Sequence, residues 1–240
     1  MELSSEDKKI EEDALAFARA NKKAIAEKLT DTSRFIPEDE PVSVFMAGSP
    51  GAGKTEASIE LLARVEEEGV EILRIDPDDL RQEFPGYLGG NSWLFQNGVS
   101  VLVEKIHDLA LKKNQSFLLD GTLSHYEKAK QNISRSLKKG RVVQILYVYQ
   151  EPKLAWEFVT SREIVEGRRI RPEHFIEQYF AARNVVNLLK VEFGSKLKVD
   201  LLMKNTDNSH KFYKAGVDKI DNHIPEKYTP ADLELMLGLN

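Results

Sequence analysis

Cysteine is absent from the 240 residues of this chain. A chain without thiols forms neither disulfide bonds nor thiolate metal sites. The five histidines, at positions 107, 125, 174, 210 and 223, are scattered along the sequence, and their spacing predicts no metal site.

Long apolar runs are missing too. No stretch approaches the roughly 20 consecutive apolar residues that a membrane-spanning helix needs. The N-terminal sequence MELSSEDKKIEEDALAFARA is highly charged and lacks the apolar core of a signal peptide. We therefore expect a cytoplasmic protein with no membrane partner.

A basic excess is the third absence. The chain has 34 Lys and Arg against 39 Asp and Glu, a net charge of −5 at pH 7. Nucleic-acid-binding proteins usually carry a basic excess, so this balance argues against a nucleic-acid partner, although it allows a local basic patch. The 41% of hydrophobic residues suits a globular protein with a sizeable core. With no repeat or linker visible, we predict one domain over residues 1–240.

Strands and helices are predicted to alternate along the chain. Apolar runs indicate strands, and the nearly continuous ones indicate burial on both faces, at 42–47, 70–75, 116–121, 141–149 and 198–205. Amphipathic or capped stretches indicate helices at 4–30, 54–69, 94–114, 124–140, 152–165, 172–192 and 229–238. The alternation predicts an α/β fold of P-loop NTPase type, with a mostly parallel sheet and helices on both faces.

Three segments of the chain lead to further expectations. Residues 1–40 form a helical segment whose apolar stripe is expected to pack on the core, the alternative being a removable or inhibitory segment. A Ser-x-x-Glu sequence at 124–127 predicts a capping box at the start of a helix. Residues 205–228 are compatible with an edge hairpin or an irregular loop.

The sequence FMAGSPGAGKTEAS, residues 45–58, contains the phosphate-binding pattern Gly-x-x-x-x-Gly-Lys-Thr between a predicted strand and a predicted helix. Its glycines allow the backbone to curl so that N–H groups point at phosphate, and the helix adds its positive end. Lys54 is expected to reach the β and γ phosphates, and the Thr55 hydroxyl to bind Mg²⁺. The predicted nucleotide-binding residues are Gly48, Ser49, Pro50, Gly51, Ala52, Gly53, Lys54, Thr55 and Glu56.

The rest of the chain indicates the class of P-loop protein. The Asn-Lys-x-Asp motif of switch GTPases is missing, since MKNTD at 203–207 has its letters out of order. The chain is also too short for a motor. A small kinase remains, which needs a base for the acceptor, an acid near Mg²⁺ and an arginine-bearing lid.

Candidates for the base and the acid lie where predicted strands end. The sequence RIDPDDL places Asp76, Asp78 and Asp79 at the carboxyl end of a strand, where open α/β sheets bind ligands. A carboxylate there could accept the proton of an acceptor hydroxyl, or instead cap the next helix. Asp120, at the end of SFLLDG, resembles a Walker B acid and is a candidate Mg²⁺ ligand, the alternative being a turn aspartate. Thr122 follows at the same edge.

The lid candidate is SREIVEGRRIRPEHF, residues 161–175, with Arg162, Arg168, Arg169 and Arg171 around a glycine. Guanidinium groups stabilise the charge that spreads over a transferring phosphoryl group. The alternative is a solvated basic turn.

Three aromatic residues, Tyr87, Trp93 and Phe95, flank a Gly-Gly-Asn loop at 89–91. They either stack a base or close the core.

Together these segments resemble the zeta-toxin kinases, the toxin halves of bacterial toxin–antitoxin pairs, over about residues 10–190. The resemblance rests on MAGSPGAGKT, IDPDDLRQEFPGY, VEKIHDLALKKNQSFLLDGT and the arginine-rich lid. It implies transfer of the γ-phosphoryl group of ATP or GTP, with Mg²⁺, to a sugar hydroxyl of UDP-N-acetylglucosamine. It also implies a cognate antitoxin as partner.

The resemblance assigns roles to individual residues. It implies that Asp78 is the catalytic base, and that Lys54 and Thr55 bind the nucleotide and Mg²⁺. It implies that Arg162 and Arg169 clamp phosphate. The residues that it implies at the sugar nucleotide are Asp78, Glu104, Asp120 and Thr122, where Asp120 stands in place of a Glu that is common in the family.

Two other readings of the sequence stay open. One is another P-loop kinase, such as a polynucleotide 5′-hydroxyl kinase or an antibiotic phosphotransferase, which would use the same base and lid. The other is a regulatory module that binds a nucleotide without transferring phosphate. Binding alone needs neither a base nor a lid, which disfavours the second reading.

Overall fold

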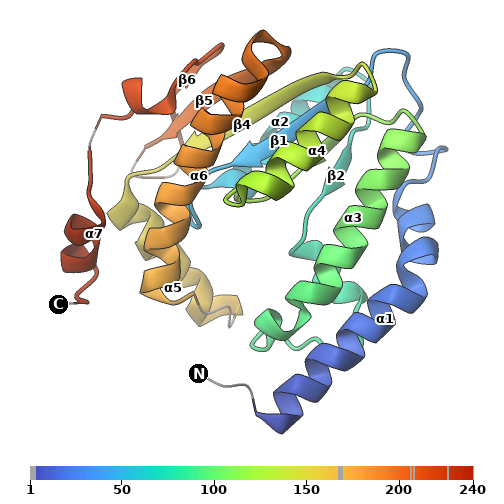
Figure 1. Cartoon of the computed structure of the whole chain (residues 1–240), viewed down its shortest axis with the longest axis horizontal. Coiled ribbons are helices and arrows are strands. Elements are labelled where there is room, and N and C mark those ends of the chain that lie inside the picture. Colours follow the sequence, from blue (N-terminus) through green and yellow to red (C-terminus); the bar gives the residue numbers. More distant parts are fainter. Residues whose placement is uncertain (1–3, 167–169, 206, 208, 226, 240) are drawn as a thin grey trace.

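The computed structural model describes residues 4–166, 170–205, 207, 209–225 and 227–239 (Figure 1). Its longer helices are α1 (Ser5–Leu29), α2 (Lys54–Glu67), α3 (Gln96–Lys112), α4 (Tyr126–Lys138), α5 (Pro152–Glu166), α6 (Pro172–Phe193) and α7 (Pro230–Met236). Its strands are β1 (Val42–Ala47), β2 (Leu73–Ile75), β3 (Phe117–Leu119), β4 (Val142–Tyr149), β5 (Leu197–Lys204) and β6 (His210–Lys214). Two 3₁₀ helices that matter for the site are η1 (Asp79–Glu83) and η2 (Ser92–Phe95).

The described strands form one sheet in the order β2-β3-β1-β4-β5-β6. Every pairing is parallel except that of β5 with β6, which is antiparallel. The predicted mostly parallel α/β fold is therefore confirmed. Within residues 205–228, β6 forms a hairpin with β5 at the edge of the sheet, which was one of the two alternatives for this segment. The central position of β1 places the P-loop in the middle of the carboxyl edge of the sheet.

Alternate residues of the strands face two separate apolar clusters. Met46, Leu118 and Leu146 belong to the cluster that packs under α2. Phe45 and Phe117 belong to the larger one, which α1, α3, α4 and α6 cover, and Figure 1 shows α4 and α6 on the near side of the sheet. Each fully buried Leu or Phe side chain contributes about 1.5–3 kcal/mol, so these clusters hold the layers together more than surface ion pairs do.

The first and fourth helices begin in different ways. Ser4 caps α1, because its hydroxyl accepts from the Asp7 N–H at 3.0 Å and the Asp7 carboxylate accepts from the Ser4 N–H at 3.3 Å. The capping box predicted at Ser124 is wrong, since α4 begins at Tyr126 and its N-cap residue makes no side-chain capping bond. Leu123, with φ 54°, turns the chain so that the Ser124 hydroxyl lies 3.1 Å from that of Thr122.

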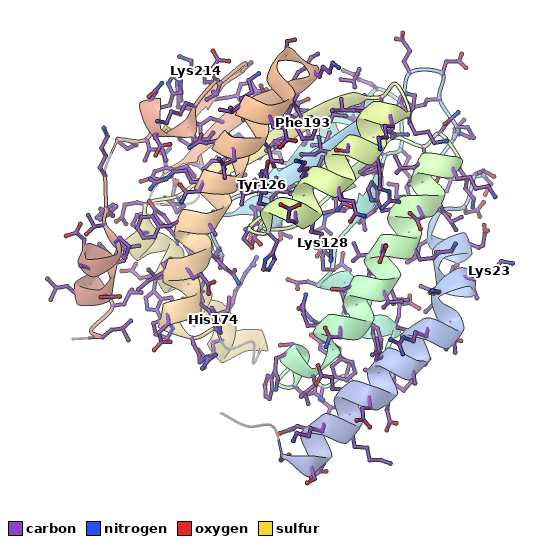
Figure 2. All side chains as sticks on the ribbon, in the orientation of Figure 1. Lys23, Tyr126, Lys128, His174, Phe193 and Lys214 are labelled. Carbon is purple, nitrogen blue, oxygen red and sulfur yellow. The ribbon has the colours of Figure 1, made fainter. Side chains whose placement is uncertain are left out.

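Side-chain contacts bind the outer helices to each other. Figure 2 shows Tyr126 beside α6, where its hydroxyl contacts Glu192, and Lys130 Nζ lies 2.6 Å from Glu192 Oε1. On the other flank α1 packs along α3, and Lys113 Nζ lies 2.7 Å from Glu27 Oε2. Over the described ranges, we find no helix that is both long enough and apolar enough to cross a membrane.

Candidate active site

The P-loop curls between β1 and α2 around the Lys54 side chain. Lys54 Nζ donates to the carbonyl oxygens of Gly48 at 3.1 Å and Ser49 at 2.7 Å, which holds the ammonium inside the curl. Gly53, with φ 81°, is the N-cap residue of α2. The first-turn N–H groups of α2 and the ammonium are thus together, as an anion-binding site requires.

Two glycines of the loop also pack closely against neighbouring elements. A Cβ on Gly51, where φ is +71°, would lie 2.0 Å from the carbonyl oxygen of Ala155 in α5. A Cβ on Gly48 would lie 2.3 Å from the carbonyl oxygen of Val148 in β4. The loop needs glycine at these positions for close packing as well as for its turn.

Charged residues from separate elements act on Lys54. Burial lowers its pKa to about 8, and the negative charges of Asp120 and Asp78 oppose that shift. Arg162 in α5 adds to the lowering, and Glu56 opposes it more weakly. Four residues that the sequence singles out therefore lie within electrostatic reach of the P-loop ammonium.

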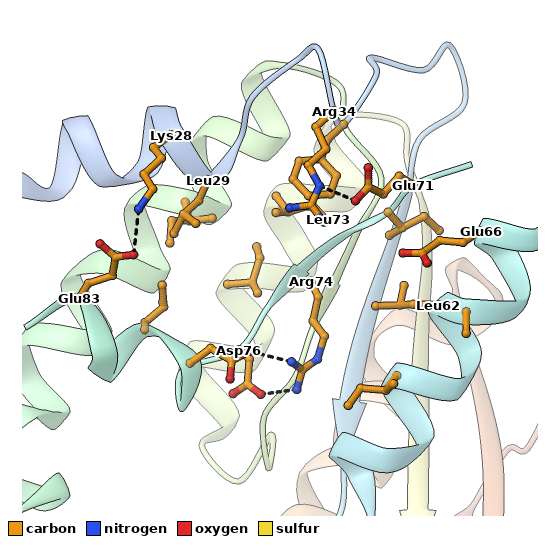
Figure 3. A pocket seen from close by; sticks show the side chains of 18 residues that line it. Lys28, Leu29, Arg34, Leu62, Glu66, Glu71, Leu73, Arg74, Asp76 and Glu83 are labelled. Carbon is orange, nitrogen blue, oxygen red and sulfur yellow. Dashed lines mark hydrogen bonds and ion pairs between the residues drawn. The ribbon is translucent and has the colours of Figure 1, made fainter. Parts of the chain in front are cut away.

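An arginine in β2 organises the carboxylates at this edge. Arg74 Nη2 contacts Asp76 and donates to Asp120 Oδ2 at 2.9 Å, and Nη1 donates to Asp79 Oδ2 at 2.8 Å. Its Nε donates to Ser58 Oγ at 3.1 Å, and Ser58 lies 2.9 Å from Asp120 Oδ2. Figure 3 shows Arg74 and Asp76 joined at one end of a pocket. The network links α2, β2, η1 and the end of β3.

That pocket, of about 540 Å³, opens beside β2 between α1 and α2. Its lining includes Arg74, Asp76 and Asp79 but no residue of the P-loop from 48 to 55. This pocket therefore lies apart from the P-loop.

The three aspartates of RIDPDDL have different surroundings. Asp76 is buried, and its Oδ1 accepts from the Asp78 N–H at 2.7 Å, as in an Asx turn ahead of η1. Asp78 takes the N-cap position of η1, but its side chain makes no capping hydrogen bond there and instead contacts Arg81. Arg81 also donates to Gln96 at 3.2 Å. Neither side chain therefore caps η1: Asp76 closes the turn before it, and Asp78 is held by a cation beside the P-loop.

The Mg²⁺ candidates are compatible with that ion. Thr55 stands in the first turn of α2, and Ser58 Oγ, 2.8 Å from the Thr55 carbonyl oxygen, connects that turn to Asp120. Asp120 is only 4% exposed, and both of its described side-chain partners, Arg74 and Ser58, bond to Oδ2. Hydroxyl and carboxylate oxygens are the hard ligands that Mg²⁺ prefers, so Thr55 and the Oδ1 side of Asp120 are suitable.

Similarity to known proteins identifies the family of this chain. A family model described as Zeta toxin matches residues 25–218. The chain belongs to the zeta toxin family. A comparison with curated protein sequences gave no match.

Solved structures with this fold include toxin–antitoxin complexes. A chain of the PezAT chromosomal toxin–antitoxin system of Streptococcus pneumoniae superposes with a TM-score of 0.60 at 17% identity, covering 99% of this chain and 94% of that one. A chain of the AvrRxo1-ORF1:AvrRxo1-ORF2 structure with sulphate ions gives 0.60 at 17% identity, covering 90% and 70%. The structure of AvrRxo1-ORF1:-ORF2 with ATP gives 0.57 at 18% identity, covering 85% and 65%. At these identities the likeness shows a shared fold.

In this zeta toxin chain the predicted lid is only partly described. Arg162 Nη2 lies 2.8 Å from Glu56 Oε1, one residue beyond Thr55, so α5 brings a guanidinium beside the P-loop helix. Arg171 lies at the start of α6, where its Nη2 is 2.7 Å from a ring nitrogen of His174. Arg168 and Arg169 lie outside the described residues, so the clamping role of Arg169 stays a prediction.

The predicted acceptor residues are placed unequally. The Thr122 carbonyl oxygen accepts from the Gly48 N–H at 3.3 Å, which sets Thr122 next to the P-loop. Glu104 is exposed on α3, and no described contact joins it to the other site residues. Tyr87 and Phe95 pack edge-to-face with ring centres 5.6 Å apart and help to close the core, whereas Trp93 is 54% exposed.

Three residues of the site were not predicted from the sequence. Arg74, Ser58 and Arg81 hold Asp120, Asp76 and Asp78 in place. One signal was available, since a charged Arg74 interrupts the otherwise apolar run ILRI immediately before the aspartates. A buried arginine requires a carboxylate partner, so its position could have pointed to the network.

Asp76 makes the stability of this zeta toxin chain depend on pH. Burial, followed by the charge of Asp120, raises the pKa of Asp76 to about 6 from its ordinary value of 3.8, against the opposing effect of Arg74. Between these values the folded state binds a proton more tightly than the unfolded state. The free energy of unfolding should therefore fall as pH rises from about 4 to 6, by about 2–3 kcal/mol for this group.

Urea titrations between pH 4.5 and 7 would measure this contribution. The variant Asp76→Asn should lose it, so that its stability falls less than that of the wild type across the window. Asp79→Asn removes a mostly exposed carboxylate from the same arginine and should keep the wild-type slope. Equal slopes for Asp76→Asn and the wild type would contradict the assignment.

Proposed function

We propose that this chain is a kinase that transfers the γ-phosphoryl group of ATP or GTP to a sugar hydroxyl of a nucleotide sugar, with UDP-N-acetylglucosamine as the first candidate. The observation that carries the proposal is the convergence on Lys54 of Asp78, Asp120 and Arg162 from three parts of the chain outside the P-loop helix. A phosphate cradle, a carboxylate for the acceptor and a guanidinium for the transferred group are the parts that phosphoryl transfer needs.

Each part has a role in this mechanism. Lys54 and the N–H groups of the P-loop bind the phosphates and neutralise their charge. Asp78, held by Arg81, orients the acceptor hydroxyl and takes its proton as the oxygen attacks the γ-phosphorus, and the bond from that phosphorus to the β–γ bridging oxygen breaks to release ADP or GDP. Arg162 swings from Glu56 to the transferring group, a move of one exposed side chain. Position and charge dominate here because the transition state is loose.

Mg²⁺, when bound, would supply positive charge that stabilises the transferring phosphoryl group. Thr55 and Asp120 would hold it. The buried position of Asp120 keeps its carboxylate in one orientation for that purpose.

Asp78, Thr122 and the Asp120 segment form the side of the site on which an acceptor would lie. We assign Glu104 to hydrogen bonds with the sugar nucleotide, because it matches the family pattern VEK…LLDGT. We further propose an antitoxin as partner, since two of the similar folds come from the PezAT toxin–antitoxin system and the AvrRxo1-ORF1:AvrRxo1-ORF2 complex.

The acceptor can be tested directly. The protein would be incubated with ATP, Mg²⁺ and, in parallel, a set of nucleotide sugars, an oligonucleotide with a free 5′-hydroxyl and an antibiotic rich in hydroxyl groups. Mass spectrometry should detect one added phosphoryl group on UDP-N-acetylglucosamine. A gain only on the oligonucleotide or the antibiotic would replace the proposed acceptor, and no gain on any acceptor would favour a module that binds a nucleotide without transfer.

A further inference from the structure

Arg74 is a partly buried cation in a short edge strand. Its side chain is 17% exposed, yet it contacts three carboxylates and one hydroxyl. Taking a guanidinium out of water costs several kcal/mol unless its N–H groups are bonded. Here Nε, Nη1 and Nη2 all donate hydrogen bonds, and these bonds offset the free energy of removing the guanidinium from water.

The three carboxylates also need a cation between them. Asp76, Asp79 and Asp120 come from β2, η1 and the end of β3, and like charges that converge in a partly buried site repel each other. Arg74 contacts all three, with Nη2 shared by Asp76 and Asp120 and Nη1 on Asp79. Its charge lets two buried acids stay close beside the P-loop helix.

The contacts to Asp120 are directional. Arg74 Nη2 and Ser58 Oγ both bond to Oδ2, each at 2.9 Å, and within the described part of the chain neither bonds to Oδ1. Ser58 is itself 2.8 Å from the carbonyl oxygen of Thr55. The Asp120 carboxylate is thus fixed by one oxygen relative to the helix turn that carries Thr55, which leaves the other oxygen to face a ligand.

We propose that Arg74 is the positioning residue of the Mg²⁺ site, which it creates by pinning Asp120 Oδ2, together with Ser58, so that Oδ1 and the Thr55 hydroxyl converge on the ion. The proposal rests on the kinase function above, in that the ion is the one that accompanies the nucleotide. Arg74 touches neither nucleotide nor metal, and it acts through Asp120.

A lysine cannot reproduce this arrangement. Arginine presents its N–H groups in a rigid plane that reaches Ser58, Asp79 and the Asp76–Asp120 pair at once. A single ammonium on a flexible stem keeps the charge but not the simultaneous contacts. Arg74→Lys separates the effect of charge from the effect of geometry.

The test measures nucleotide binding rather than turnover. Affinity for a fluorescent ATP analogue would be determined for the full chain in excess EDTA and in saturating Mg²⁺, and the ratio gives the enhancement by Mg²⁺. Arg74→Met should leave affinity in EDTA within about twofold and lower the enhancement by about 10- to 100-fold, the usual effect of losing a residue that orients a metal ligand. Arg74→Lys should fall between Arg74→Met and the wild type.

Coupling to Asp120 makes the test specific. Asp120→Asn should also lower the enhancement, and the double variant Arg74→Met/Asp120→Asn should be no worse than Asp120→Asn alone, because both changes remove the same function. Arg64→Met, which breaks the exposed pair of Arg64 with Glu60 on α2, is the matched control and should behave as the wild type.

The outcomes are separable. Full Mg²⁺ enhancement in Arg74→Met, or effects of the two single changes that multiply in the double variant, would overturn the proposal. If Arg74→Met does not fold, Ser58→Ala provides a second test, because it removes the other bond to Asp120 Oδ2 and should also lower the enhancement by Mg²⁺. An unchanged enhancement in both Ser58→Ala and Arg74→Lys would overturn the proposal. If the enhancement follows this pattern but no acceptor is phosphorylated, the kinase function fails and the role of Arg74 stands.

Discussion

Replacement of Asp78 by Asn is expected to slow phosphoryl transfer by at least about 100-fold, the low end for loss of a general base. Asn keeps the shape of the side chain and can still accept a hydrogen bond from Arg81, but it cannot take a proton at neutral pH. Affinity for ATP should stay unchanged, since the proposed nucleotide contacts are those of Lys54 and the P-loop. Single-turnover transfer and equilibrium nucleotide binding would be measured side by side.

A matched control exists in α3. Asp108 pairs with Arg135 and is 46% exposed, close to the 39% of Asp78 in its pair with Arg81. Asp108→Asn should therefore remove a comparable ion pair without affecting transfer. Normal transfer in Asp78→Asn would remove Asp78 from the mechanism, and a similar loss in both variants would show that the effect is structural.

Gly51→Ala is expected to abolish measurable nucleotide binding and to lower stability more than a comparable change elsewhere. The new Cβ would lie 2.0 Å from the Ala155 carbonyl oxygen, so either the P-loop or α5 must move. Moving the loop spreads its N–H groups, and moving α5 displaces Arg162. The steric conflict adds about 1–3 kcal/mol of destabilisation, the usual cost of overpacking.

Gly140→Ala separates backbone strain from the clash. Gly140 has φ +73° against +71° for Gly51, but a Cβ there would meet nothing within 4 Å. Both variants therefore pay about 1–2 kcal/mol for a left-handed residue, and only Gly51→Ala adds the conflict with Ala155. Urea unfolding and nucleotide titration of the two variants would decide, and equal stability with intact binding in Gly51→Ala would contradict the packing argument.

The parts of the fold that the sequence predicts well are those determined by local chemistry. The apolar run of β1 and the glycines of the P-loop specify backbone conformations with few alternatives, and both occur as expected. β2 is shorter than predicted, starting at Leu73 rather than Val70, because its ladder begins only where Leu73 N–H donates to Ser116 at 3.2 Å. Strand length here depends on a neighbour that is distant in sequence.

The candidate site likewise contains residues that the local sequence predicts and residues that it does not. Lys54 and Thr55 follow from their motif, and Asp78 and Asp120 follow from their positions at the ends of strands. The role of Arg74 depends on Asp120, 46 residues further along the chain, so the arginine within ILRI indicates a buried partner but does not identify it. Residue type alone could not distinguish Asp78 from Asp76 either, because one contacts Arg81 and the other accepts from a backbone N–H.

The position of β2 has a consequence for when activity is lost. It is a three-residue edge strand held on one side by β3, yet it precedes the proposed base and carries Arg74. Proteins open locally in cooperative units, and short edge elements with few ladder bonds belong to the units that open at the lowest free energy. We therefore expect local opening at β2 to displace the proposed base and Arg74 while the P-loop, on the central β1, stays in place. The proposed phosphoryl transfer would then cease before the nucleotide is released or the chain unfolds.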